Sequence, residues 1–207
     1  MRISRTLVAA VVAATTLTAA ATGCSKTATQ TGKPAPATTS AASGTSTASP
    51  SGSAPAQQGE YTKLLIQASD LEAPVTFTAG PPTADPDGKP GVATTFSTED
   101  GDHQVIDTVV VLADPAAATD ALNAAKASRS KDLKNPRSAP LDAGAGGTTI
   151  SGNTPDGKKG ITIALLTQGK ALVTLEFVGQ PDFLAPPEFV LSTSKKQAAA
   201  VQKGLGG

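Results

Sequence analysis

A stretch of 35 residues without a large apolar side chain limits how much of this chain can fold. From Ser25 to Gly59, 30 residues are Ala, Thr, Ser, Pro or Gly, and the others are Lys and Gln. No buried apolar surface would offset the entropy lost on ordering such a backbone. We therefore expect a disordered tether over residues 24–59, which spans roughly 30 Å root-mean-square as a flexible coil. The folded part is expected to be a single domain over residues 60–207.

The overall composition excludes several classes of function. Lys plus Arg and Asp plus Glu both number 17, so the chain has no basic field with which to hold nucleic acid. The one cysteine, Cys24, excludes an intramolecular disulfide, and the one histidine, His103, excludes a site built on a pair of histidines. Aromatic residues make up only 3%, with no Trp, which leaves little for stacking bases or sugars.

The first 24 residues, MRISRTLVAAVVAATTLTAAATGC, follow the pattern of a secretory signal. Arg2 and Arg5 form a short basic start, and an uncharged run rich in Ala, Val and Leu continues to Gly23. The sequence Ala21-Thr22-Gly23-Cys24 resembles the lipobox of bacterial lipoproteins. That resemblance implies a signal peptide over residues 1–23 and attachment of diacylglycerol, with acyl chains such as palmitate, to Cys24. A plain transmembrane anchor and an ordinary secretory signal are the alternatives.

The signal and the tether together indicate a location. An Ala/Thr-rich signal, a lipobox and a Thr/Ser/Ala/Pro tether resemble those of mycobacterial and related actinobacterial envelope lipoproteins. The resemblance implies a lipid anchor at the outer face of the cell membrane, and two or more acyl chains on Cys24 would hold it firmly. The tether composition fits an O-glycosylated stalk as well as an unmodified spacer.

Residues 60–207 carry the larger apolar side chains and predict an α+β domain. The pattern predicts a short helix over 61–71, strands over 75–79, 92–97, 105–112, 161–166 and 171–178, and a further strand around Ile150. Helices are expected from Pro115, with Asp114 as the N-cap, and from Pro186 to near Gly204. The expected architecture is an antiparallel sheet with helices mainly on one face.

The hexapeptide pattern Pro-Asp-Gly-Lys-x-Gly occurs twice, at residues 86–91 and 155–160. Each copy precedes a predicted strand, a Gly-containing turn, a second strand and a Pro-initiated helix. One interpretation is that Asp-Gly is simply common hairpin chemistry. The other is a duplicated strand-strand-helix unit. The sequence leaves both open.

The C-terminal pattern LVTLEFVG…PPEFVLSTSKKQAAAVQKGL is similar to two kinds of exported α+β domain. One is the extracellular sensor domain of mycobacterial receptor kinases, and the other is the PsbP/Mog1-type sheet-and-helix domain. Either resemblance implies a small domain that binds a ligand or a partner.

No residue pattern predicts catalysis or metal binding. His103 follows Asp100 and Asp102, but neighbouring residues on a strand point to opposite faces, and the chain has no G-x-S-x-G nucleophile motif. We interpret this segment as a solvated hairpin turn. A calcium loop beginning at Asp85 would need a glutamate at its twelfth position, where Phe96 stands. We expect no catalytic residue, no metal and no cofactor, and only Cys24 is predicted as a functional residue.

These observations favour a non-enzymatic function. We expect a lipid-anchored envelope lipoprotein whose domain binds an envelope protein or a small or lipid ligand, with no role for nucleic acid. A carrier that encloses lipid or glycolipid in an apolar cavity is the first alternative. A hydrolase that uses Ser or Asp without histidine is the second.

Overall fold

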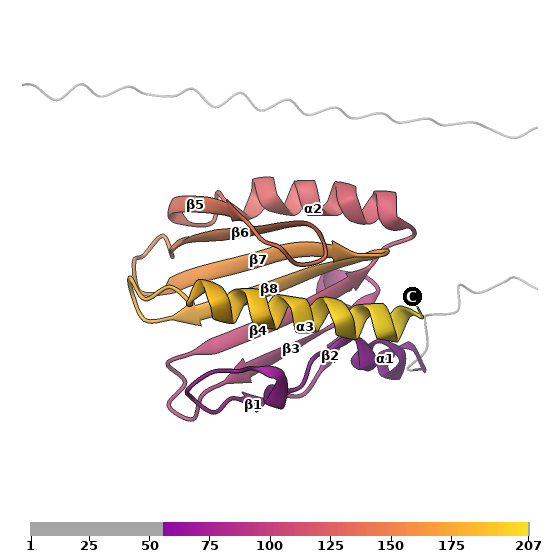
Figure 1. Ribbon diagram of the computed structural model, residues 1–207, viewed down its shortest axis with the longest axis horizontal. Coiled ribbons are helices and arrows are strands. Elements are labelled where there is room, and N and C mark those ends of the chain that lie inside the picture. Colours follow the sequence, from indigo (N-terminus) through magenta and orange to yellow (C-terminus); the bar gives the residue numbers. More distant parts are fainter. Residues whose placement is uncertain (1–55, 207) are drawn as a thin grey trace, which may run out of the picture. The chain divides into compact units, whose positions relative to one another are not determined.

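The computed structural model describes residues 56–206, and an antiparallel sheet of eight strands lies at the centre of this part (Figure 1). The strand order is β1-β3-β4-β8-β7-β6-β5, and β2 pairs with β3 beside β1. The strands are β1 (Thr78–Ala79), β2 (Thr83–Ala84), β3 (Gly91–Ser97), β4 (Gln104–Val111), β5 (Lys134–Pro140), β6 (Ala145–Asn153), β7 (Gly160–Gln168) and β8 (Ala171–Gly179). The α+β class and the antiparallel sheet are therefore confirmed. The predicted signal peptide, Cys24 and most of the predicted tether lie outside the described residues.

Two hairpins meet at the centre of the sheet. β3 and β4 form one, β7 and β8 form the other, and β4 pairs with β8 along its whole length from Gln104↔Val178 to Val111↔Ala171. Helix α2 (Pro115–Arg129) follows β4, and helix α3 (Pro187–Leu205) follows β8. Asp114 caps α2, since its side chain accepts a hydrogen bond from the Ala117 N–H at 2.8 Å, as the sequence predicts.

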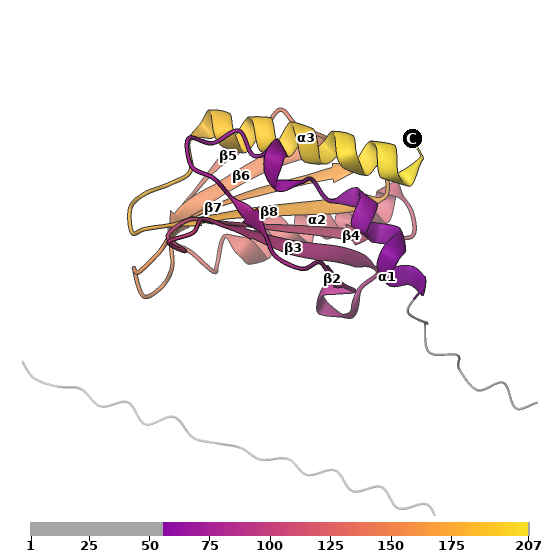
Figure 2. The ribbon, with the colours of Figure 1, turned by 90° about the horizontal axis from the view of Figure 1, so that it is seen from below.

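The two long helices lie on opposite faces of the sheet, as Figure 2 shows. Strand β7 is buried on both faces, and its residues alternate between two core clusters. Ile161, Ile163 and Leu165 pack with Leu122 of α2, whereas Ala164 and Leu166 belong to the cluster that contains Val201 of α3. The face under α3 is also covered by the N-terminal turns, so most helical segments share one face, and α2 is the exception.

The positions of the helices bear on the duplication hypothesis. β4 and β8 are antiparallel neighbours, so a twofold rotation about an axis perpendicular to the sheet would superpose the hairpin β3–β4 on the hairpin β7–β8. Such a rotation would place the helices that follow the two hairpins on the same face of the sheet. The order strand, strand, helix occurs twice, but α2 and α3 lie on different faces, so this rotation does not relate the two units.

The two Pro-Asp-Gly-Lys segments form different kinds of turn. The second forms the β6–β7 turn, where the Thr154 hydroxyl donates to Asp156 at 2.6 Å. Its counterpart is the β3–β4 turn, in which Thr98 donates to Asp100 at the same distance. The first segment instead forms the short 3-10 turn η3 (Pro86–Gly88). The repeated sequence is thus turn chemistry used in two different geometries.

The N-terminal segment differs from its prediction. Instead of one helix over 61–71, the chain forms α1 (Ala56–Tyr61), then two 3-10 turns, η1 (Thr62–Leu64) and η2 (Ala68–Asp70). The prediction was wrong because a tertiary contact replaces the helical hydrogen bond. The Ile66 N–H donates to the side chain of Gln197 on α3 at 3.0 Å, and Leu65 is extended. Helix α1 also begins four residues before the expected start of the domain.

Two further differences concern the ends of elements and an edge strand. Gly206, with φ 72°, forms the C-cap of α3, whereas Gly204 packs against Leu64. Strand β5 was not predicted, because all seven of its residues are exposed and give no apolar alternation. Two of them are prolines, which sheets tolerate at an edge strand. Among the described residues, no helix is both long enough and apolar enough to span a membrane.

Candidate functional site

An apolar pocket lies at the end of the sheet where β4 begins and β8 ends. Its volume is about 260 Å³, and four of the five phenylalanines of the chain line it. The lining residues are Ala73, Pro74, Val75, Phe77, His103, Gln104, Val105, Phe177, Val178, Gly179, Phe183, Ala185, Pro186 and Phe189. In a chain with so few aromatic residues, this gathering distinguishes the pocket from the rest of the described surface.

The floor and one wall of the pocket are built from packed rings. Val105 of β4 and Phe177 of β8 are paired residues and therefore lie on the same face of the sheet. The ring of Phe189, in the first turn of α3, packs edge-on to Phe177 with a centroid distance of 5.4 Å. The Phe189 ring also stacks on Phe77 with a centroid distance of 6.3 Å. Such ring pairs stabilise each other beyond simple burial, so this wall holds a defined shape.

The loop between β8 and α3 forms the opposite wall and lies close to the sheet. The Gly160 N–H donates to the Gln180 carbonyl at 3.0 Å. A side chain at Gly160 would meet the Phe183 carbonyl at 2.7 Å, and one at Gly179 would meet it at 3.1 Å. These two glycines are paired across β7 and β8, and a Cβ would clash with the loop at Gly160 and crowd it at Gly179.

Two side-chain bonds join this loop to its neighbouring turns. Gln180 donates to Asp102 in the β3–β4 turn at 2.9 Å. Asn153, at the end of β6, donates to Asp182 at 2.7 Å. The three loops are thus connected, and the pocket is preformed.

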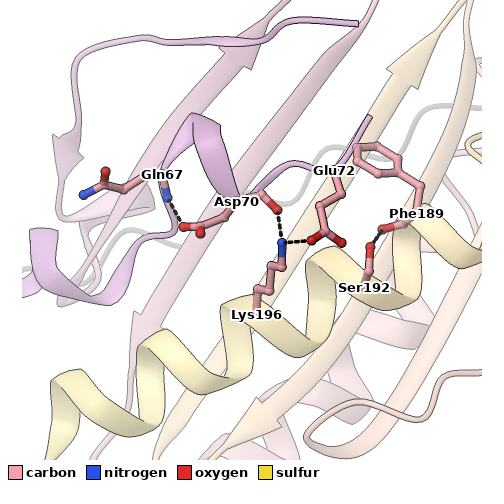
Figure 3. A network of polar contacts seen from close by, with 6 residues as sticks. All are labelled: Gln67, Asp70, Glu72, Phe189, Ser192 and Lys196. Atoms are coloured by element: carbon pink, nitrogen blue, oxygen red, sulfur yellow. Dashed lines mark hydrogen bonds and ion pairs between the residues drawn. The ribbon is translucent and has the colours of Figure 1, made fainter. Parts of the chain in front are cut away.

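The third wall is the segment that follows η2, and α3 holds it in place (Figure 3). Lys196 donates to the Asp70 carbonyl at 2.9 Å and pairs with the Glu72 carboxylate at 2.9 Å. Asp70 in turn accepts from the Gln67 N–H at 2.8 Å. These contacts fix the chain directly before Ala73, where it enters the pocket wall.

Two of the three exposed large apolar side chains among residues 56–206, Val75 and Phe183, line the pocket. Val75 is 44% exposed, Phe183 58% and Leu184 41%, and these are the exposed large apolar residues found within the described part of the chain. The His103 ring lies 5.8 Å from the Phe183 ring, centroid to centroid. An apolar entrance of this kind is typical of a surface that meets an apolar ligand or partner.

The structure assigns His103 and its acidic neighbours to different tasks. Asp100 and Thr98 form the hairpin turn that the sequence predicted, and the hydrogen bonds from the Thr98 hydroxyl and the Asp102 N–H lower the pKa of Asp100. Asp102 accepts from Gln180, while His103 lines the pocket. Within residues 56–206, no group of three or more His, Cys, Asp or Glu side chains is arranged to share a metal ion.

Asp107 carries a buried carboxyl group and lies two residues after Val105 of the pocket floor, on the same face of β4. It is 0% exposed, and neither of its carboxyl oxygens has a hydrogen-bond partner among the described residues. Burial raises the pKa of Asp107 well above its usual range and outweighs the opposing effect of the nearby Ile66 N–H, which is bonded to Gln197. Thr193 and Ser194 on the facing side of α3 also have unpaired buried hydroxyls. Burial without a hydrogen-bond partner therefore favours the neutral form of this carboxyl.

Sequence reasoning did not find the pocket or Asp107. Phe77 lies 100 residues before Phe177, and Phe177, Phe183 and Phe189 belong to a strand, a loop and a helix, so no single periodic pattern connects the four. Asp107 did leave a signal, because it occupies an inward position of a strand whose other inward residues are Val105, Val109 and Val111. A charged residue in that alternation is rare in a core and could have been singled out.

Comparisons with known proteins add little to this geometry. No protein-family model and no curated protein matches the chain. Among solved structures, the chain is similar to the crystal structure of the extracellular domain of PknH from Mycobacterium tuberculosis. The identity is 12%, the TM-score is 0.49, and the match covers 72% of this chain and 97% of that one. A likeness with so low a TM-score and identity carries no conclusion about this chain.

Proposed function

We propose that this protein is an exported lipoprotein, anchored through Cys24, whose α+β domain binds an apolar ligand without catalysing a reaction. The observation that carries the proposal is the preformed pocket, in which four of five phenylalanines line a space of about 260 Å³ with an exposed apolar mouth. Ligand sites are commonly concave, apolar and few in number, with a small set of polar groups that orient the ligand. His103 and Gln104 are the polar side chains of this lining.

The volume of the pocket favours a small ligand or a single apolar chain. Sites for drug-sized molecules range from about 300 to 1,000 Å³, so a space of about 260 Å³ is at the low end. A lipid or glycolipid with several acyl chains would leave most of its apolar surface outside. The pocket therefore supports binding of one chain or ring system better than transport of a complete multi-chain lipid.

The lining supports binding rather than hydrolysis. Among the described residues, the lining contains no Ser, Thr, Cys, Asp, Glu or Lys, so it offers no hydroxyl, thiol, amine or carboxylate side chain to act with His103 at the place where a ligand would lie. Asp102 and Asp182 stand beside the lining and are engaged by the amides of Gln180 and Asn153. A hydrolase would need its reactive groups within hydrogen-bond reach of the substrate.

The position of the pocket suits an anchored receptor. Helix α1, through which the tether would enter the domain, lies with the C-terminal end of α3 at the end of the sheet remote from the β8–α3 loop (Figure 1). A tether that joins Cys24 to this end would leave the pocket at the end of the domain remote from the attachment. It would also allow the domain to move over roughly 30 Å.

Removing one exposed ring tests the binding site. Phe183→Ala should weaken binding of the uncharged fluorescent probe N-phenyl-1-naphthylamine about tenfold, because the ring buries apolar area against the ligand. Leu184→Ala is the matched control, since Leu184 is a similarly exposed neighbour that does not line the pocket. Fluorescence titration of the purified protein measures both. Equal affinities in the two variants and the original protein would contradict binding at this pocket.

Removing the single thiol tests the anchor. Cys24→Ala should move the protein from the membrane fraction to the soluble fraction of the producing bacterium, because every acyl chain would be attached to that residue. Fractionation after a high-salt wash and labelling with a radioactive fatty acid give two independent measurements. A variant that stays with the membranes would overturn the lipoprotein assignment.

A further inference from the structure

A buried backbone donor lies between two possible acceptors, one on helix α3 and one on strand β4. The Ile66 N–H donates to the Gln197 side chain at 3.0 Å, and it also lies close enough to the Asp107 carboxyl to act on it. The Gln197 amide nitrogen donates in turn to the Leu64 carbonyl at 2.8 Å. Gln197 is completely buried, so one side chain makes both of these bonds inside the core. The carboxyl of Asp107 is therefore a second acceptor beside one of the two bonds.

The side chains that face Asp107 carry no charge. Thr94 of β3 and Leu175 of β8 are its cross-strand partners and share its face of the sheet. Helix α3 contributes the buried polar side chains of Thr193, Ser194 and Gln197. Asp107 is the one buried ionisable side chain of residues 56–206. The charged residues of the elements packed around it are at least partly exposed: Lys63, Asp70, Glu72, Glu176, Glu188, Lys195, Lys196 and Lys203.

Loss of the Asp107 proton would change which acceptor is the stronger one. A hydrogen bond to an ionised acceptor is about twice as strong as one between neutral groups. While the carboxyl is protonated, it competes poorly, and the Ile66 N–H donates to Gln197. Once a negative charge forms where no cation faces it, a neighbouring N–H is needed to offset the loss of water. The Ile66 N–H is the backbone donor beside this carboxyl.

We propose that the Ile66 N–H is a proton-controlled switch, which donates to Gln197 while Asp107 is protonated and to the Asp107 carboxylate once the proton is lost. The transfer breaks one of the two bonds by which Gln197 holds the N-terminal segment to α3. This segment continues through η2 to Ala73 in the wall of the pocket. Ionisation of Asp107 therefore loosens the wall, and this consequence for binding rests on the proposed function.

An NMR titration of the isotope-labelled protein tests the switch. The side-chain carboxyl carbon of Asp107 and the amide proton of Ile66 are followed between about pH 4 and about pH 10, where a buried carboxyl can titrate. We expect the Ile66 proton to move downfield, and the side-chain amide signals of Gln197 to shift, with the same midpoint as the Asp107 carbon. The signals of Leu122 and Ile163, in the core cluster on the other face of the sheet, should stay in place.

The variant Asp107→Asn removes the titrating group with little change of shape, and it should abolish the transition at Ile66. Asp120→Asn, on the exposed side of α2, is the control with the same chemical change, and it should retain the transition. The titration of the original protein needs no variant, so it decides the matter even where a substitution unfolds the domain.

Binding of N-phenyl-1-naphthylamine at pH values on either side of the transition tests the link to the pocket. The original protein should bind this uncharged probe about threefold more weakly above the transition, an effect within the contribution of one hydrogen bond. The Asp107→Asn variant should lack this decrease. Other titrating groups, including His103 of the lining, contribute equally to both proteins.

Each outcome decides a separate point. An Ile66 shift that does not follow the Asp107 carbon, or that persists in the Asp107→Asn variant, overturns the switch. A carboxylate signal from Asp107 already at about pH 5 overturns it as well, because an unperturbed carboxyl ionises near pH 4. A switch without a change in probe affinity overturns its link to the pocket. Failure of the probe to bind at any pH overturns the proposed binding function and leaves the NMR test of the switch unaffected.

Discussion

The two ends of helix α3 pack against the same face of the same sheet in different ways. At the C-terminal end, Val201 is completely buried, and Gly204 lies so close to Leu64 that a Cβ at position 204 would clash with the Leu64 side chain. At the N-terminal end, Phe189 borders a pocket of about 260 Å³. We call these the closed end and the open end of α3.

The difference comes from the N-terminal segment rather than from the helix. At the closed end, η1 inserts Leu64 beside α3, and the Gln197 amide donates to the Leu64 carbonyl at 2.8 Å. At the open end, the chain after η2 borders the space from the side, and phenylalanine rings pack against one another around it. One helix can thus contribute to the core at one end and to a binding site at the other.

The largest predicted effect is at the closed end. Val201→Asp would place an unpaired carboxylate in the core and should cost several kcal/mol, out of a total stability of about 5–15 kcal/mol. Lys195→Asp, on the exposed side of the same helix, should cost about 0.5 kcal/mol, because its ion pair with Asp142 is exposed. Urea denaturation of both variants measures the difference. Equal small losses would show that α3 is not docked as described.

A second prediction concerns Asp107, which lies between the two ends. Its pKa is raised by burial, so between about pH 4 and the raised value the folded protein keeps a proton that the unfolded chain has lost. The free energy of unfolding should therefore decrease as the pH rises through this window. Asp107→Asn removes the titration and should be the more stable protein at pH 7, by about 1–3 kcal/mol, with little difference at pH 4.

Urea denaturation at a series of pH values measures this dependence. The comparison needs only the difference between the two proteins at each pH, because other titrating groups contribute equally to both. A difference that does not grow between pH 4 and pH 7 would show that Asp107 is ionised, or paired, in the folded protein.

The smallest predicted effect concerns the contact that holds the pocket wall. Lys196→Gln should cost about 0.5–1 kcal/mol, since the lysine bonds to a backbone carbonyl and to Glu72 in a partly buried position. It should also speed hydrogen exchange in residues 71–75. Lys195→Gln is the control, and it should leave exchange in this segment unchanged. Equal exchange in the two variants would mean that Lys196 does not hold the wall.

The sequence predicts the central elements well because their signals are local. Inward Val105, Val109 and Val111 mark β4, and Asp114 with Pro115 marks the start of α2. The 61–71 segment was misassigned because the Ile66–Gln197 bond joins residues 131 positions apart. No local sequence pattern indicates that α2 packs on the opposite face of the sheet from α3.

The candidate site could not be predicted for a related physical reason. A pocket is the space left where several segments meet, and here the segments around Phe77, His103 and Phe183 approach one another only in the folded chain. Gly160 and Gly179 permit that approach, but a glycine in the sequence does not reveal which backbone will lie against it. Only Cys24 was predicted as a functional residue, and it lies outside the described residues.

The most direct test of the account is to map where an apolar ligand binds. Titration of isotope-labelled protein with octyl glucoside below its critical micelle concentration should shift the NMR signals of His103, Val105, Phe177, Gly179 and Phe189 at the open end. The signals of Val201 and Leu64 at the closed end should stay in place. Shifts confined to another surface, or no saturable shifts at the open end, would contradict the proposal that this pocket is the binding site.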